Sequence, residues 1–334
     1  MKILYDYQIF YNQRYGGPSR YFVELIKELI NLNYDLKVIS PIYINNHLKE
    51  LNQKYVLGSY FENTKNMGYI FKLYNELRIK YFIKKNNFDI IHSTYYKDIY
   101  NTKNPLVITV YDLIHEIFSY EYNFNDLPKK KIIEKAEHLI CISENTKNDL
   151  IKFYNVPEHK VSVVYLANYL KKKSNDKIKT TKPFFLYVGS RKRYKNFSLL
   201  VNAYKKLKKI NENYNIVCFG GGNFLKEEIL NFKDKNIDIK KLIYLEGDDE
   251  LLSKLYNSAE AYICTSKYEG FGLPVLEAMS HGCPVICSNS SSLPEVYGNA
   301  ALSFNPNSEE NLEECINNFL NNSSLKDKMI ESGY

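Results

Sequence analysis

Two glutamates frame a short glycine-containing segment at residues 267–277, KYEGFGLPVLE. Glu269 precedes the glycines, and Glu277 follows it after seven intervening residues. Glycine allows the backbone to approach a ligand closely. Pro274 is typical of the first turn of a helix, where unpaired N–H groups and the helix dipole favour a diphosphate. The pattern therefore predicts a loop acid and a helix acid that contact opposite ends of one ligand, although a solvated helix residue and a surface loop acid would show the same spacing.

Apolar runs indicate the elements that position this segment. Short apolar runs alternate with longer amphipathic segments, as in parallel sheets with helical crossovers. The predicted strands are KILYDY, DLKVIS, DIIHS, PLVITVYD, HLICIS and VSVVYL in the first half, and PFFLYVGS, NIVCFGGG, KLIYLEG, AYICTS and CPVICSN in the second. Apolar residues recur on one face of 18–30, which predicts a helix there. Because the Glu269 loop directly follows AYICTS, we expect it at the carboxyl end of a strand, where such sheets bind ligands.

A chain of 334 residues is long enough for two domains. The lysine-rich stretch 169–182 has no periodic apolar pattern, and we interpret it as a linker. The prediction is an α/β chain with two doubly wound, Rossmann-like parallel-sheet domains, 1–168 and 183–334, that face a central cleft.

The wider sequence resembles the retaining nucleotide-sugar glycosyltransferases of family 4, which have the GT-B fold. The resemblance covers nearly the whole chain and is found in EGFGLPVLEAMSHGCPVICSNSSSLPEV, FFLYVGSRKRYKNFSLLVNAY, YGGPSRYFVELI and ICISENTKNDLIKFYNVPEHKVSVVYLAN. It implies a hexosyltransferase that moves a sugar from a nucleotide-diphosphate donor to a saccharide or lipid-linked acceptor in surface-glycan synthesis, with retention of configuration. It also implies that the domain 183–334 binds the nucleotide sugar and that the domain 1–168 lies on the acceptor side.

Residue by residue, the resemblance also implies a donor site. Its members would be Gly17, Arg191, Lys195, Gly270, Phe271, Gly272, Leu273 and Glu277. Glu277 would bond the ribose hydroxyls, and Arg191 and Lys195 would grip the diphosphate. Gly17 would let a loop of the first domain approach the same group. A turn glycine at Gly17 and surface charges at Arg191 and Lys195 are the alternatives.

The catalytic residues implied by the resemblance are Glu269, Asp112 and His115. In VITVYDLIHE, Tyr111 stands where family members commonly have histidine, followed by Asp112. His115 would reach the cleft, or would be a capping or partly buried residue. This variant is similar to an O-antigen mannosyltransferase branch, which favours GDP-mannose. His92, which follows a short apolar run, is open to both a cleft and a core position.

The chain has no Asp-x-Asp pair of the kind that commonly holds Mg²⁺ for a leaving diphosphate. A guanidinium, an ammonium and a helix N-terminus would stabilise that charge instead. We therefore expect a metal-independent reaction with no cofactor other than the donor substrate, a GDP- or UDP-sugar.

The net charge of +7 comes partly from lysine runs at 129–131, 171–173 and 205–209. These runs are interpreted as solvated faces and a linker, or as contacts to anionic lipid or an acidic acceptor. Because they are dispersed, a nucleic-acid partner is not expected.

The N-terminus is typical of a strand rather than a signal peptide, and no apolar stretch is long enough to cross a bilayer. A cytoplasmic protein is expected, with peripheral contact at the inner face of the membrane left open.

Cys141, Cys218, Cys264 and Cys287 lie in apolar runs, which predicts buried thiols rather than metal ligands or a disulfide framework.

Two other functions remain open. A sugar-nucleotide epimerase of the same fold would need another pattern of cleft acids and histidines than KYEGFGLPVLE. A binding protein that has lost catalysis is compatible with Tyr111.

Overall fold

The computed structural model describes residues 1–62, 68–100, 102–122, 127–170 and 175–333, with only the backbone of Lys208 and Lys209. The chain divides into two compact units, Met1–Leu166 and Ala167–Tyr334. The sequence placed the end of the first domain at residue 168 and a linker at 169–182. Within that linker, residues 171–174, which include its lysine run, lie outside the described residues.

Unit 1 is built on a seven-stranded sheet with the order β3-β2-β1-β4-β5-β6-β7. All neighbouring strands pair in parallel. The strands are β1 Lys2–Tyr5, β2 Asp35–Tyr43, β3 Val56–Tyr60, β4 Ile90–Ser93, β5 Leu106–Val110, β6 His138–Cys141 and β7 Val161–Val163. The order reverses between β1 and β4, which is the switch point of a doubly wound sheet.

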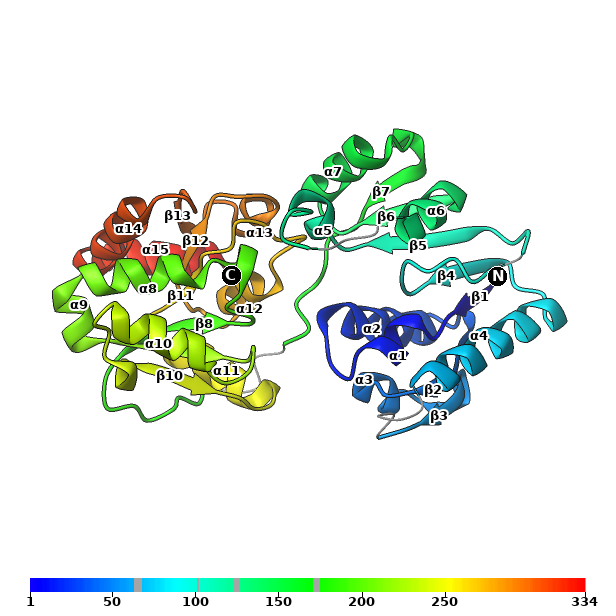
Figure 1. Ribbon diagram of the computed structural model, residues 1–334, viewed down its shortest axis with the longest axis horizontal. Coiled ribbons are helices and arrows are strands. Elements are labelled where there is room, and N and C mark those ends of the chain that lie inside the picture. Colours follow the sequence, from blue (N-terminus) through cyan, green and yellow to red (C-terminus); the bar gives the residue numbers. More distant parts are fainter. Residues whose placement is uncertain (63–67, 101, 123–126, 171–174, 334) are drawn as a thin grey trace. The chain divides into compact units, whose positions relative to one another are not determined.

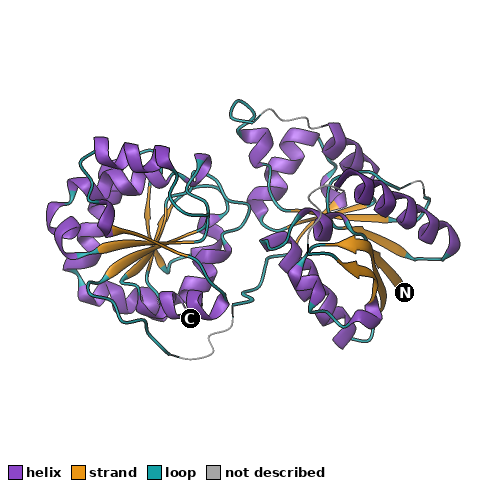
Figure 2. Cartoon of the chain, turned by 60° about the horizontal axis from the view of Figure 1, so that its bottom comes forward, coloured by secondary structure: helices purple, strands orange, loops and turns teal. Residues whose placement is uncertain are grey.

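Helices connect these strands and lie on both faces of the sheet (Figure 1; Figure 2). They are α1 Gln8–Asn12, α2 Gly17–Asn31, α3 Asn46–Lys49, α4 Gly68–Lys85, α5 Ile114–Ile117, α6 Leu127–Lys135 and α7 Glu144–Tyr154, with 3-10 turns η1 Gln53–Tyr55 and η2 Glu158–Lys160. The helix expected at 18–30 is α2, and its apolar face is buried through Phe22, Val23 and Ile26.

Unit 2 repeats this architecture with a six-stranded parallel sheet of order β10-β9-β8-β11-β12-β13. Its strands are β8 Phe184–Val188, β9 Asn215–Phe219, β10 Leu242–Leu245, β11 Ala261–Cys264, β12 Val285–Ser288 and β13 Ala301–Phe304. Its helices are α8 Phe197–Lys206, α9 Lys208–Asn213, α10 Lys226–Asp234, α11 Asp249–Ser258, α12 Leu273–Ser280, α13 Leu293–Tyr297, α14 Glu309–Asn321 and α15 Ser323–Gly333, with 3-10 turns η3 Arg193–Lys195 and η4 Ile239–Lys241. The switch point lies between β8 and β11.

The predicted α/β class with two doubly wound parallel sheets is confirmed, and each predicted strand run contains a strand. The sequence missed β3 and β13. The burial pattern of β3 is mostly exposed, and β13 has one buried residue, Phe304. Both are edge strands, so neither shows the continuous apolar run of a strand that is covered on both faces.

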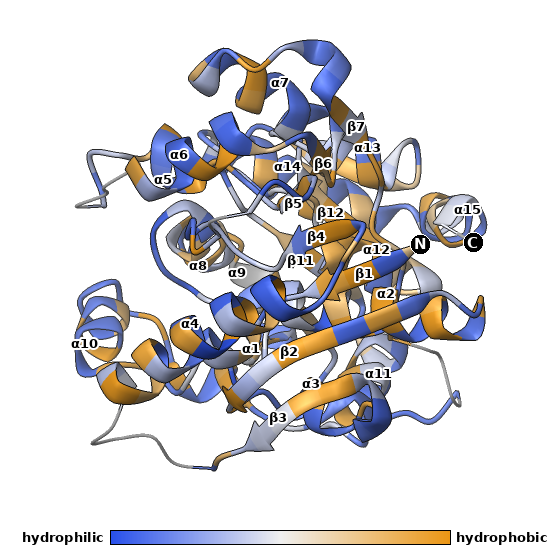
Figure 3. Ribbon diagram, turned by 90° about the vertical axis from the view of Figure 1, so that its right-hand side faces the viewer, coloured by the Kyte–Doolittle hydropathy of each residue, from blue (hydrophilic) through white to orange (hydrophobic). Residues whose placement is uncertain are grey.

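Figure 3 shows hydrophobic residues along strand β4 and also within helices such as α10. Cys141, Cys218, Cys264 and Cys287 lie in strands and are buried, as predicted. Within the described ranges, no helix is both long enough and apolar enough to cross a membrane.

Candidate functional site

The strongest cluster of predicted residues lies at the switch point of unit 2. Strands β8 and β11 pair there, with Ala261 opposite Phe185 and Tyr262 opposite Leu186. Parallel strands end at the same edge of a sheet, so the loops after β8 and β11 leave it side by side. The first loop contains Lys195 and the second contains Glu269.

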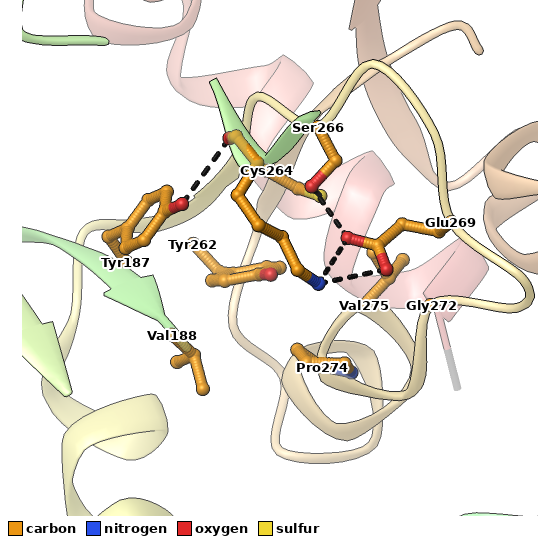
Figure 4. A pocket seen from close by; sticks show the side chains of 10 residues that line it. Tyr187, Val188, Tyr262, Cys264, Ser266, Glu269, Gly272, Pro274 and Val275 are labelled. Atoms are coloured by element: carbon orange, nitrogen blue, oxygen red, sulfur yellow. Dashed lines mark hydrogen bonds and ion pairs between the residues drawn. The ribbon is translucent and has the colours of Figure 1, made fainter. Parts of the chain in front are cut away.

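These two side chains form an ion pair, with Lys195 Nζ 2.6 Å from Glu269 Oε1 and 2.9 Å from Oε2 (Figure 4). Ser266 Oγ donates to the same Oε1 at 2.6 Å. The Lys195 side chain is 21% exposed and that of Glu269 14%. Burial acts to lower the pKa of Lys195, but the adjacent carboxylate of Glu269 raises it above its usual range. Lys195 is therefore a cation at any physiological pH.

The backbone beneath the ion pair is held by the neighbouring loop. Thr265 Oγ1 donates to the carbonyl of Lys195 at 3.0 Å, and Tyr187 OH donates to the same carbonyl at 3.3 Å. The Lys267 amide donates to the carbonyl of Tyr194 at 2.7 Å. Both loops are therefore fixed to each other before either side chain meets a ligand.

Three consecutive serines after β12 fix the Glu269 loop from its other side. The Glu269 amide donates to Ser291 Oγ at 2.8 Å. Ser292 Oγ donates to the carbonyls of Glu269 at 2.8 Å and Phe271 at 2.9 Å, and Ser290 Oγ donates to that of Lys267. Sequence reasoning assigned no role to these serines. Their only signal was the run SSS that follows a predicted strand.

Gly272 is the N-cap residue of α12, with φ of +116°, a backbone conformation that favours glycine. A Cβ atom there would lie 2.8 Å from Leu293 Cδ2. Pro274 lies in the first turn of the helix, as the sequence predicted. The helix therefore begins at Leu273. Pro274 has no N–H and the Val275 amide donates to the carbonyl of Gly272 at 2.9 Å, so in this first turn the Leu273 amide is the donor that the helix leaves for a ligand.

Glu277 lies one helical turn further along α12. Tyr256 OH of α11 donates to Glu277 Oε2 at 3.1 Å and is 3.2 Å from the carbonyl of Pro274. Tyr256 is fully buried, so its hydroxyl orients the half-buried carboxylate of Glu277 from the protein interior. Sequence reasoning did not identify Tyr256.

The pocket at this position brings together part of the predicted set. Lys195, Glu269 and Gly272 line it, together with Ser266, Pro274 and Val275. Tyr187, Val188, Tyr262 and Cys264 complete its wall (Figure 4). Gly270, Phe271, Leu273 and Glu277 lie in the same loop and helix but are not lining residues.

Arg191 lies in the same loop as Lys195, but its side chain is only 3% exposed. Nε and Nη2 contact the Glu228 carboxylate at 2.8 and 3.2 Å. Nη2 is also 3.0 Å from the carbonyl of Asn223, and Nη1 is 3.5 Å from that of Gly220. The guanidinium therefore joins the β8 loop to the loop after β9, and it does not line the pocket of Lys195.

The predicted residues of unit 1 lie at the carboxyl ends of β1 and β5. Gly17 is the first residue of α2, and a Cβ atom on it would have no neighbour within 4 Å. Asp112 follows β5, and its carboxylate accepts from the amide of Ile114 at 3.1 Å. Burial raises the pKa of Asp112, and the charge of Lys129 opposes part of that rise. His115 is exposed, with its ring 4.6 Å from that of Tyr122.

Lys129 contradicts the interpretation of its lysine run as a solvated or lipid-facing surface. Its side chain is 8% exposed and pairs at 2.7 Å with Glu116, which is 4% exposed. Its ammonium also donates to the carbonyl of Asp112 at 2.9 Å and lies 4.7 Å above the Tyr96 ring. The prediction was wrong for this residue because α6 turns Lys129 toward α5 and the residues that precede it. Lys130 and Lys131 are exposed.

Two residues that the sequence left open are part of the core of unit 1. Tyr111 is buried, with its ring 6.0 Å from that of Tyr21. His92 is buried, and its Nε2 is 2.9 Å from Thr109 Oγ1. Burial lowers the pKa of His92 to about 3, so it is a neutral core residue.

Family models match both units. The model for glycosyltransferase family 4 matches residues 15–167, and that for glycosyl transferases group 1 matches residues 169–334. Curated relatives include O-antigen chain mannosyltransferase B of Escherichia coli, 28% identical over 58% of this chain and 54% of its own length. O-antigen chain mannosyltransferase RfbU of Salmonella typhimurium is 28% identical over 75% of this chain and 69% of its own length. The chain thus matches between about half and about two thirds of these relatives.

Solved structures share the fold across the chain. A glycosyltransferase from Rickettsia africae superposes with a TM-score of 0.74 and 20% identity, over 99% of this chain and 92% of that one. WaaG, a glycosyltransferase involved in lipopolysaccharide biosynthesis, has a TM-score of 0.76 and 17% identity, over 100% and 94%. At these identities the likeness shows the fold alone, and both neighbours are glycosyltransferases.

Proposed function

Because this chain belongs to the glycosyltransferases described by the group 1 and family 4 models, we propose that it is a retaining, metal-independent hexosyltransferase. It would transfer a sugar from a nucleotide-diphosphate donor to a saccharide or lipid-linked acceptor. The observation that carries this proposal is the Lys195–Glu269 ion pair beside the N-terminus of α12.

The chemistry of the leaving group supports this use of the pocket. Cleavage of the bond between the sugar and the diphosphate leaves negative charge on the departing oxygen and positive character on the sugar. Lys195 keeps its proton at physiological pH, and the N-terminus of α12, with its N-cap residue Gly272, lines the same pocket. Both groups are held in place by protein contacts, so little reorganisation is needed as the charge develops.

In this proposal Glu269 orients Lys195, and the cations bind the diphosphate. Two of the three N–H donors of an ammonium are directed at the Glu269 carboxylate, and the third suits a phosphate oxygen. Glu269 would thus orient Lys195 and face the sugar that is transferred. Arg191 does not line the pocket, so it would act as a second cation on the diphosphate by exchanging the 3.5 Å contact from Nη1 to the Gly220 carbonyl for a phosphate oxygen.

Glu277 would bond the ribose hydroxyls, since a carboxylate held by Tyr256 presents fixed acceptors. The amides of Gly270, Phe271, Gly272 and Leu273 would face the sugar and the diphosphate. Gly17, Asp112 and His115 of unit 1 would act toward the same donor, with the open space above Gly17 allowing close approach of a ligand.

The donor we propose is GDP-mannose, with other GDP- and UDP-sugars as competitors. Mannosyltransferases of O-antigen chains are the relatives that support this choice. They also support a product in surface-glycan synthesis. A lipid-linked acceptor is suggested by a Campylobacter jejuni relative, 29% identical, whose name contains diphospho-undecaprenol.

Retention would follow from attack on the side of the leaving group. The acceptor oxygen bonds to the anomeric carbon as the bond from that carbon to the diphosphate oxygen breaks. The acceptor proton passes to the departing phosphate. No nucleophile of the protein takes part in this scheme.

The test compares donor turnover by the wild type and Lys195→Met, with Lys192→Met as the matched control. Lys192 is an exposed lysine in the same loop. We expect turnover to fall about a hundredfold or more in Lys195→Met, by analogy with the loss of one preorganised donor to a developing charge. The control should keep full activity, and circular dichroism should show both variants folded.

Three results would contradict parts of the proposal. Full turnover in Lys195→Met would remove the diphosphate role of Lys195. Strong inhibition by EDTA would contradict metal independence. A product whose anomeric configuration differs from that of the donor, measured by NMR, would contradict retention.

A further inference from the structure

The carboxylate of Asp6 is buried at the switch point of unit 1, and no step of the proposed reaction uses it. Asp6 directly follows β1 and is 0% exposed. Strand β1 lies between β2 and β4 at this point of the sheet (Figure 1). Within the described residues, the groups that contact this carboxylate are all uncharged. A buried charge is costly unless hydrogen bonds replace the water that it loses, so Asp6 needs a complete set of donors.

Most of these donors belong to the end of β4 and to the segment after it, residues 94–100, which we call the β4 loop. Thr94 contacts the Asp6 carboxylate with its amide, 3.3 Å from Oδ2, and with its hydroxyl. Ser93 Oγ is 3.0 Å from Oδ2, and Tyr100 OH donates to the same oxygen. Both ends of the β4 loop are therefore bound to one carboxylate that follows β1.

Gln8 of α1 holds the middle of the β4 loop. Its Oε1 accepts from the Lys97 amide at 2.9 Å, and its Nε2 donates to the Lys97 carbonyl at 3.0 Å. The Gln8 amide donates to Asp6 Oδ1 at 2.8 Å, and Gln8 Nε2 is 3.0 Å from Asp6 Oδ2. The carboxylate therefore orients Gln8 as well, and Gln8 fixes the backbone directly after Tyr96.

Tyr96 connects the β4 loop to the end of β5. Its hydroxyl accepts from the Tyr111 amide at 3.0 Å. The centre of its ring is 4.7 Å from Lys129 Nζ, and this ammonium donates to the Asp112 carbonyl at 2.9 Å. Tyr96 thus holds the backbone before Asp112 directly, and it supports the cation that binds the carbonyl of Asp112.

We propose that Asp6 is a positioning residue for Asp112, on which it acts through the β4 loop and Tyr96. The carboxylate fixes where the Tyr96 hydroxyl lies, and that hydroxyl fixes the direction in which the chain leaves β5. A small displacement of a group that acts on a bound substrate lowers the rate of the reaction. The inference rests on the role proposed for Asp112 in the transfer reaction.

Hydrogen exchange of the Tyr111 amide, resolved by mass spectrometry, tests these contacts without any donor. We expect exchange at least about tenfold faster in Tyr96→Phe, because the amide loses its acceptor. Asp6→Asn should accelerate the same exchange, although the substitution is in the segment after β1. The double variant should exchange no faster than the faster single variant, since both substitutions interrupt one series of contacts.

Steady-state kinetics of the same variants measure the effect on transfer. We expect kcat to fall by about tenfold or more in Tyr96→Phe and in Asp6→Asn, with little change in KM for the donor. A purely structural role would lower the melting temperature and leave the kcat of the folded enzyme unchanged. Tyr100→Phe removes one donor to Asp6 and should act in the same direction, so it provides the test if Asp6→Asn does not fold.

Tyr43→Phe and Asp89→Asn are the matched controls. Tyr43 is a buried tyrosine of β2 whose hydroxyl donates to Gln53 at 3.1 Å. Asp89 accepts from the Lys2 amide at the opposite end of β1. Both controls should keep the wild-type exchange of the Tyr111 amide and the wild-type kcat.

Four outcomes would overturn the inference. The first is unchanged exchange of the Tyr111 amide in both Asp6→Asn and Tyr100→Phe, and the second is additive effects in the double variant. The third is a wild-type kcat in Tyr96→Phe while Asp112→Asn is inactive, which would leave the role of Asp112 intact. The fourth is full activity of Asp112→Asn, which would refute the proposed role of Asp112 together with the inference.

Discussion

At the scale of single residues, a lysine held 2.6 Å from a carboxylate keeps its charge. Burial alone would favour the neutral amine, but Glu269 reverses that effect and raises the pKa of Lys195. Titration of Lys195 therefore does not enter the neutral pH range. Any loss of activity between pH 6 and 8 (about the range in which histidine titrates) must come from another group.

Tyr256 gives a prediction about donor affinity. In Tyr256→Phe the ring is kept and the hydrogen bond to Glu277 is lost. Since one neutral-to-charged hydrogen bond contributes about 1.5–3 kcal/mol, we expect KM for the donor to rise by about tenfold or more. The value of kcat should change little, because Glu277 would contact the ribose and not the reacting atoms.

Steady-state kinetics over a range of donor concentrations give KM and kcat separately. Tyr244→Phe is the matched control, since its hydroxyl bonds Glu246 at an exposed position. A fall in kcat with unchanged KM in Tyr256→Phe would contradict the role assigned to Glu277.

At the scale of elements, one buried ion pair joins α6 to α5. Lys129 of α6 contacts Glu116 at 2.7 Å and the carbonyl of Asp112 at 2.9 Å. Tyr154 OH of α7 donates to the same Glu116 carboxylate at 2.6 Å. Two helices, α6 and α7, therefore hold α5, which contains His115, and the segment before it, which contains Asp112.

Lys129→Met should destabilise unit 1 by about 3–5 kcal/mol, because Glu116 would keep a buried charge without its partner. The variant should also raise the pKa of Asp112 further, since the charge of Lys129 opposes the effect of burial. Urea unfolding measures the first effect. A shift to higher pH of the acidic limb of the activity profile measures the second.

Lys130→Met is the control, because Lys130 is exposed and surface substitutions usually change stability by less than about 0.5 kcal/mol. Lys129→Met/Glu116→Gln should recover part of the lost stability. Equal stability of Lys129→Met and Lys130→Met would show that the ion pair does not hold the loop.

At the scale of the whole molecule, His92 should make stability depend on pH. Its pKa is lowered by burial to about 3, whereas unfolded histidine titrates near its usual value of about 6.5. Between these values the unfolded chain binds a proton that the folded chain does not. The free energy of unfolding is therefore unaffected by His92 above about pH 6.5, and it falls by about 1.4 kcal/mol per pH unit below that value.

The urea midpoint at pH 7 and pH 5 checks this prediction. His92→Gln should show a smaller difference between the two pH values than the wild type. His159→Gln replaces an exposed histidine and should keep the wild-type difference. An unchanged difference in His92→Gln would contradict the assignment.

Donor binding should raise the thermal stability of the folded chain, because a ligand that binds only the native state stabilises it. At about a hundredfold excess over Kd the gain is about 2.7 kcal/mol. A thermal-shift series should give the largest increase in Tm with GDP-mannose. A larger shift with a UDP-sugar would overturn the donor proposal while leaving the transferase intact, and Lys195→Met should reduce whichever shift is seen.

Much of this protein was predictable from the sequence. Apolar runs located the central strands, and the spacing of glycine, proline and glutamate predicted the loop that enters α12. These features are local, since a buried parallel strand needs an apolar run and a helix start needs residues that suit its geometry. Edge strands such as β3 and β13 lack that continuous pattern and were missed.

The tertiary structure decided which charges meet. Lys195 and Glu269 are 74 positions apart, and only the adjacency of β8 and β11 brings them together. It also assigned Arg191 to Glu228 and buried Lys129 against Glu116. A lysine in the sequence has the same charge whether it faces water or a buried carboxylate. The partner and the burial of each charge follow from the packing of elements that are distant along the chain.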